Sequence, residues 1–160
     1  MLRLLAFIFS ITLASPAFAG GIFNDSAATP AYAGTSVTTL WSKTLGAGAV
    51  DSGDAMRLRA DAETVAGWGA DAWVTLNGQT LTTIASFYGV GQTSEIDIEV
   101  WRTGTTTGTV IGSVVFNGVW CPIPASDVTG LAWTSGQTLA IVGVADVANG
   151  LVLMRAGEQH

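Results

Sequence analysis

The chain has 160 residues, of which 49% are hydrophobic and only 11% are charged. A chain of this length can bury one good core, so we expect a single folded domain. The formal net charge of −6 leaves no basic surface for a phosphate backbone, which excludes nucleic acid as a partner of this domain.

The first 19 residues have the pattern of a secretory signal peptide. Arg3 supplies the positive start, residues 4–14 are an apolar run, and Ala17 and Ala19 are the small residues that a signal peptidase reads. We therefore predict cleavage after Ala19. A retained anchor is the alternative, although about 20 apolar residues are needed to span a bilayer.

Residues 20–36 are rich in Gly, Ala, Ser and Pro and have no periodicity. Ile22, Phe23 and Tyr32 are isolated apolar points in this segment. The composition predicts an extended arm that packs on a neighbouring copy during assembly.

From residue 37 onward, short segments alternate apolar with polar residues and are bounded by Gly, Ser, Thr or Asn. This pattern is typical of strands with one face in a core and one in water. Asn77-Gly78 and Asn149-Gly150 predict tight hairpins, because both residue types tolerate a positive φ. Residues 117–137, which include Pro122 and Pro124, are expected to form a long irregular connection. The predicted strands are residues 37–44, 55–62, 73–76, 81–87, 95–102, 109–116, 138–145 and 151–158.

Eight strands without a helix predict an all-β fold, an antiparallel two-sheet sandwich over residues 37–160. Eight is the strand count of a jelly roll, and the long connection favours that architecture because jelly-roll crossovers need such loops. An immunoglobulin-like sandwich has the same local signature and is the alternative.

The sequence also resembles small jelly-roll domains of bacteriophage virion proteins. The likeness begins at residues 40–48 and 52–60, where a Leu-x-Ala-Gly turn leads to a Gly-Asp-x-Leu-Arg strand. It continues at Gly78 with Leu81, and at Glu99 with the turn at residues 102–104, and it covers about residues 40–158. The resemblance implies a structural protein of the head-decoration, spike or tail-fibre type, usually trimeric.

Few residues suit catalysis or metal binding. The only histidine is His160, at the end of the chain, which argues against a Ser-His-Asp or Cys-His enzyme and against zinc. The glycines lie between strands, as in turns, and no phosphate-binding loop precedes a helix. We therefore expect no enzyme, no metal and no cofactor. Cys121 is the only cysteine and is expected to be a small buried apolar residue beside Trp120.

The strand at residues 95–102 carries the best candidate site. Alternation places Glu95, Asp97, Glu99 and Trp101 on one face, with successive carboxylates about 7 Å apart. Two carboxylates at such a separation could hydrolyse a glycoside. A solvated face, paired across strands with arginines, is the favoured interpretation, and a binding or subunit-contact face is the third. The arginines are Arg57 and Arg59.

Six tryptophans are many for a chain of this size. Trp41, Trp73 and Trp133 are expected in the core, whereas Trp68, between two glycines, is expected to be exposed in a loop. Exposed tryptophans stack on sugars or anchor interfaces.

Two functions follow from these patterns. The first is a non-enzymatic virion protein, a homotrimer attached to a capsid or tail protein. The second is an exported carbohydrate-binding β-sandwich that binds a cell-surface glycan through its loop tryptophans and acidic face. The corresponding locations are the virion, or a secreted or periplasmic compartment after cleavage.

Overall fold

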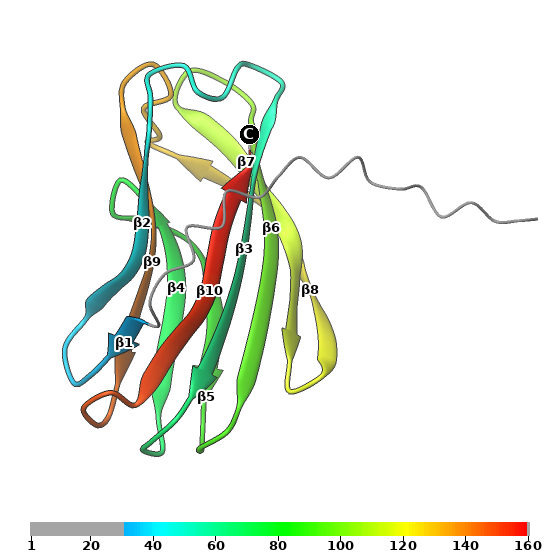
Figure 1. The fold of residues 1–160 in the computed structure, drawn as a ribbon. Coiled ribbons are helices and arrows are strands. Elements are labelled where there is room, and N and C mark those ends of the chain that lie inside the picture. The colour runs from blue at the N-terminus through cyan, green and yellow to red at the C-terminus, as the bar shows by residue number, and fades with distance from the viewer. Residues whose placement is uncertain (1–30, 160) are drawn as a thin grey trace, which may run out of the picture.

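The computed structural model describes residues 31–159 and shows an all-β protein. Ten strands form a six-stranded and a four-stranded sheet, and every pairing is antiparallel. The strands are β1 (Ala31–Ala33), β2 (Thr38–Leu45), β3 (Ala55–Thr64), β4 (Ala70–Leu76), β5 (Gln79–Phe87), β6 (Thr93–Arg102), β7 (Thr107–Phe116), β8 (Val119–Thr129), β9 (Gln137–Ala145) and β10 (Leu151–Gln159). Figure 1 shows the two sheets packed face to face. No helix in the described part of the chain is long and apolar enough to cross a membrane.

The strand order is that of a jelly roll with one added hairpin. The six-stranded sheet has the order β1-β10-β3-β6-β7-β8, and the four-stranded sheet has the order β2-β9-β4-β5. Without β7 and β8, two four-stranded sheets remain and the chain crosses repeatedly between them, as in the eight-stranded jelly roll. The hairpin β7–β8 extends the first sheet beyond β6 and forms its outer edge (Figure 1).

The predicted fold class is confirmed, and all eight predicted strands are present with ends that differ by three residues or fewer. Two expectations about the extent of the strands were wrong. The segment 117–137 is not an irregular connection, because Val119–Thr129 is the strand β8. The last part of the predicted arm is also a strand, since Ala31–Ala33 pairs with β10 and Ala33 is fully buried. Residues 1–30, with the predicted cleavage site at Ala17 and Ala19 and the arm residues Ile22 and Phe23, lie outside the described residues.

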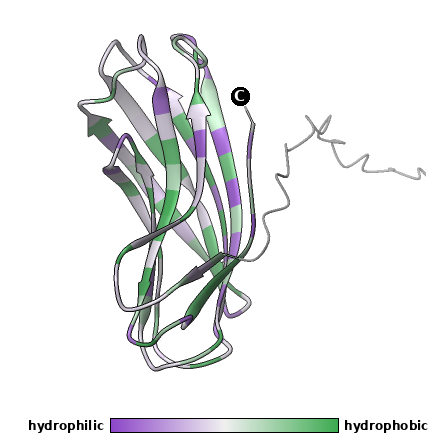
Figure 2. Cartoon of the chain, turned by 60° about the vertical axis from the view of Figure 1, so that its left-hand side comes forward, coloured by the Kyte–Doolittle hydropathy of each residue, from purple (hydrophilic) through white to green (hydrophobic). Residues whose placement is uncertain are grey.

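Alternating side chains build the core between the sheets. Inward residues of β3 and β6, such as Leu58 and Ile98, are buried, whereas their neighbours along the chain face solvent. Figure 2 shows this alternation as bands of opposite hydropathy along the strands. Trp41 and Trp133 are in the core as predicted. Trp73 is not, because it lies half-buried on the outer side of the four-stranded sheet.

Two Asn-Gly turns fix the register of the hairpins. Asn77 and Gly78 have φ values of 51° and 79°, and Asn117 and Gly118 have φ values of 49° and 78°. Positive φ at both central residues defines the type I′ turn that suits a two-residue hairpin. The first turn confirms the hairpin predicted at Asn77-Gly78, and the second turn places β8 against β7. The hairpin predicted at Asn149-Gly150 was wrong, because this connection crosses from β9 in one sheet to β10 in the other.

Candidate functional site on the outer face of the six-stranded sheet

Two neighbouring rows of side chains cross the outer face of the six-stranded sheet. Residues that pair across antiparallel strands point to the same side, so the pairing register defines each row. The first row runs from β10 to β8 as Arg155, Asp61, Glu95, Val115 and Trp120. The second row, two residues further along β6, is Gly157, Arg59, Asp97, Ser113 and Pro122.

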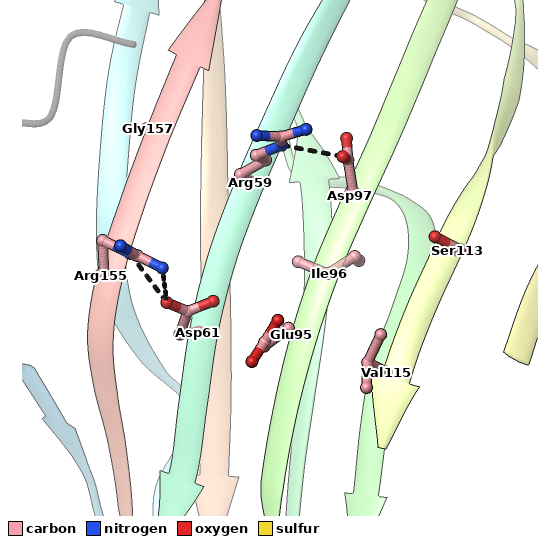
Figure 3. Close-up of a pocket in the computed structure, with 9 residues that line it drawn as sticks. All are labelled: Arg59, Asp61, Glu95, Ile96, Asp97, Ser113, Val115, Arg155 and Gly157. Carbon is pink, nitrogen blue, oxygen red and sulfur yellow. Dashed lines mark hydrogen bonds and ion pairs between the residues drawn. The ribbon is translucent and has the colours of Figure 1, made fainter. Parts of the chain in front are cut away.

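Between these rows the sheet face is hollowed. The outer hollow has a volume of about 370 Å³ and contains side chains from four strands (Figure 3). Its floor is the sheet itself, and Gly157 on this floor contributes no side chain. The lining residues are Arg59, Asp61, Glu95, Ile96, Asp97, Ser113, Val115, Arg155 and Gly157.

Asp97 is the centre of an ion-pair cluster. Arg57 donates from Nε to Oδ1 of Asp97 at 2.6 Å and from Nη2 to Oδ2 at 2.5 Å, which is a bidentate pair. Arg59 donates from Nε to Oδ2 of the same carboxylate at 2.8 Å. The predicted cross-strand pairing with Arg57 and Arg59 is thus confirmed for Asp97.

The charge state of Asp97 follows from this cluster. Partial burial alone would raise the pKa of Asp97, but the hydrogen bonds from Arg57 and Arg59 outweigh it and hold the pKa below its ordinary value. The hydrogen bond to Asp97 likewise raises the pKa of Arg57. Asp97 is therefore ionised at neutral pH and is not the protonated acid that glycoside hydrolysis needs.

A second ion pair lies at the other side of the outer hollow. Arg155 donates from Nε and Nη2 to Oδ2 of Asp61, at 2.8 and 2.5 Å (Figure 3). Glu95 is exposed between the two ion-paired groups and has no hydrogen bond or ion pair with the described residues. The outer hollow thus presents two oriented guanidinium groups, two paired carboxylates and one carboxylate open to a ligand.

The other predicted site residues lie further away. Glu99 and Trp101 share the face of Asp97, and the indole Nε1 of Trp101 donates to Oε2 of Glu99 at 3.2 Å. Neither residue lines the outer hollow. Trp68 is 82% exposed, as predicted, but it lies in the loop between β3 and β4, where its backbone N–H donates to Asp146. Tyr32 of the predicted arm is half-exposed on β1, at the opposite edge of the sheet from β8.

Trp120 was missed as a candidate. It is 62% exposed and ends the first row, on the same face as the outer hollow. Sequence reasoning placed it in an irregular loop beside a buried cysteine, and that expectation was wrong: Cys121 is exposed on β8. The Asn117-Gly118 pair is the signal that identifies β8, and alternation along β8 would then have placed Trp120 with Glu95.

The described residues contain no cluster suited to a metal ion. In residues 31–159, no group of three or more His, Cys, Asp or Glu side chains is arranged to hold one.

The sequence matches no family model, and no curated relative was found. A similar solved structure is the EclA C-terminal domain, a sugar-binding protein, with 12% sequence identity, a TM-score of 0.38, and a match that covers 82% of this chain and 71% of that one. At this identity and TM-score the likeness says nothing about the ligand of this chain.

Proposed function

We propose that this protein is a non-catalytic carbohydrate-binding module and that the outer hollow with Trp120 is its glycan site. The observation that carries the proposal is the pairing register, which puts an exposed indole and a hollow of oriented polar groups on one rigid face. A volume of about 370 Å³ lies within the range of small-molecule sites.

The chemistry of the two parts suits a sugar. One face of a pyranose ring carries C–H groups that pack on an aromatic ring, and the ring edge carries hydroxyl groups. Guanidinium groups donate to hydroxyl oxygens, and Glu95 accepts from hydroxyl hydrogens. Because Asp97 and Asp61 fix Arg59 and Arg155, these donors lose little conformational freedom when a ligand binds.

Trp120→Ala is the direct test. We expect the wild-type protein to bind one or more glycans on an array, and the variant to bind at least one of these glycans more weakly by about tenfold or more, because the stacking surface is lost. Calorimetric titration of the best glycan gives the two affinities. Trp68→Ala is the matched control, since it removes an even more exposed tryptophan from a different place and should leave the affinity unchanged. A Trp120→Ala variant that binds every one of these glycans with wild-type affinity, or a wild-type protein that binds no glycan, would refute the proposal.

A structural role in a virion is the second candidate, and the hairpin β7–β8 favours it. The outer strand of this hairpin, β8, is exposed on both faces over most of its length. The face of β8 that points to the inner side of the sheet carries Val119 and Cys121, and the described residues do not cover them. Pairing through the free edge of β8 is hindered. Val119 is the last residue of its turn and directs its N–H to β7. Because the N–H direction alternates along a strand, the backbone nitrogen of residue 122 faces the free edge. This residue is Pro122, which has no N–H to donate to another strand. Association would therefore use the face and not the edge.

Light scattering tests this second candidate. Full-length wild-type protein at micromolar concentration should have the mass of a trimer, and Val119→Ser with Cys121→Ser should shift it toward the monomer by removing apolar contact area. Trp120, on the opposite face of the same strand, should tolerate alanine in this assay. A wild-type monomer at these concentrations would count decisively against the assembly role.

A further inference from the structure

The outer side of the four-stranded sheet carries a larger groove whose chemistry differs from that of the outer hollow. The Trp73 groove has a volume of about 640 Å³ and runs across β2, β9 and β4. Two cross-strand rows form its centre. They are Thr39, Val142 and Trp73, and Ser42, Ala140 and Thr75.

No charged residue lines the Trp73 groove, although the outer hollow on the other sheet contains five. The polar groups of the groove are hydroxyls and an amide, and they share its lining with the half-buried indole of Trp73. The hydroxyls of Thr39 and Ser42 make no hydrogen bond with the described residues, so both can donate to and accept from a ligand. Asn77 is held at the end of the groove, because its Oδ1 accepts from the Thr138 N–H at 2.7 Å.

A second copy of the chain fits this face poorly. Stable interfaces pack as densely as protein interiors, and two concave faces placed together would enclose a void. The lining is also mixed, because the apolar residues Trp73, Val142 and Ala140 share it with hydroxyl-bearing Thr39, Ser42 and Thr75. A ligand that carries its own hydroxyl groups and one apolar surface satisfies the groove better.

We propose that the Trp73 groove is a second binding site, for an uncharged oligosaccharide that stacks on Trp73 and hydrogen-bonds to the hydroxyls of Thr39 and Ser42. The two sites lie on opposite outer faces of the sandwich, so one short glycan cannot occupy both. A chain with two such sites can bridge two glycan strands, and its avidity for a polymer exceeds its affinity for either fragment.

Calorimetric titration with neutral gluco-, manno- and galacto-hexaoses tests the second site. We expect at least one hexaose to bind with an affinity that stays constant between about 0.05 and 0.5 M NaCl, because no charge lines the groove. Trp73→Ala should weaken that binding by about tenfold or more. Trp120→Ala should leave the same binding unchanged, which separates this site from the proposed glycan site.

A second variant guards against a folding defect, because Trp73 is half-buried. Thr39→Val with Ser42→Ala removes two exposed hydroxyls at nearly constant volume and should weaken the same hexaose by about tenfold. The proposal is overturned if no neutral hexaose binds, or if both variants bind like wild type. It is also overturned if Trp120→Ala abolishes the binding, which would assign the hexaose to the outer hollow.

Discussion

Replacing Trp133 by alanine is expected to lower the free energy of unfolding by about 3–5 kcal/mol, the largest stability effect of any tryptophan substitution in this chain. Trp133 lies in the loop between β8 and β9, yet only 2% of it is exposed. Its indole Nε1 donates to the carbonyl of Thr107 at 2.8 Å, and its carbonyl accepts from the N–H of Gly48 at 3.1 Å. Alanine would leave a cavity in the core and would remove the indole hydrogen bond to the Thr107 carbonyl, which would keep only its bond from the Thr103 N–H at 3.2 Å.

Urea unfolding at neutral pH measures the change. Trp68→Ala is the control, because Trp68 is 82% exposed and its loss should change the free energy by less than about 0.5 kcal/mol. Gly108 gives independent support for tight packing here: a Cβ atom at that position would lie 3.1 Å from the Trp133 ring. Equal destabilisation by the two tryptophan substitutions would show that Trp133 is not a core residue.

Alternation predicted the strands that carry the site. The segment around β6 alternates without interruption, so Ile96, Ile98 and Val100 could be assigned to the core and Glu95, Asp97 and Glu99 to the outside before any pairing was known. The ion pairs with Arg57 and Arg59 followed from the same alternation on β3. Local pattern is sufficient wherever one face of a strand is buried and the other is wet.

β8 was missed because it has no such contrast. Almost all its residues are exposed, so burial imposes no alternation, and Pro122 and Pro124 are typical of loops. Both prolines are compatible with an edge strand. Pro122 is on the free side, and the register between β7 and β8 shifts just beyond Ile123. The Asn117-Gly118 turn outweighs the prolines as a signal, since it has the chemistry of the correctly predicted Asn77-Gly78 turn.

The candidate site could not be assembled from sequence for a different reason. The first row joins Arg155 on β10 to Asp61 on β3, which are 94 residues apart, and the order of strands in a sheet leaves no local trace in the chain. Trp120 enters the row only through two further pairings, β6 with β7 and β7 with β8. The composition of each strand was therefore predictable, but their juxtaposition was not.

Asp97 links the stability of the outer face to its binding capacity. One carboxylate holds both Arg57 and Arg59, and Arg59 lines the outer hollow. Neutralising Asp97 would remove the charge that offsets two neighbouring guanidinium groups and would weaken the hold on Arg59. Asp97→Asn should thus weaken glycan binding as well as folding, whereas the isosteric change Glu95→Gln should affect only binding.

We expect Asp97→Asn to lower the free energy of unfolding by about 1–2 kcal/mol at pH 7, a value discounted because the pair is partly open to solvent. The pKa of Asp97 in the folded protein lies below its ordinary value of 3.8, so the stabilisation is present above pH 3.8 and is lost as the pH falls through the folded-state pKa. Urea unfolding of both proteins should therefore give free energies that differ at pH 7, and the difference should shrink as the pH falls below 3.8. Glu95→Gln, on the same strand and face but without an ion pair, should match wild type throughout this pH range within about 0.5 kcal/mol. A difference between Asp97→Asn and wild type that persists undiminished at low pH would show that the ion pairs with Arg57 and Arg59 do not stabilise this face.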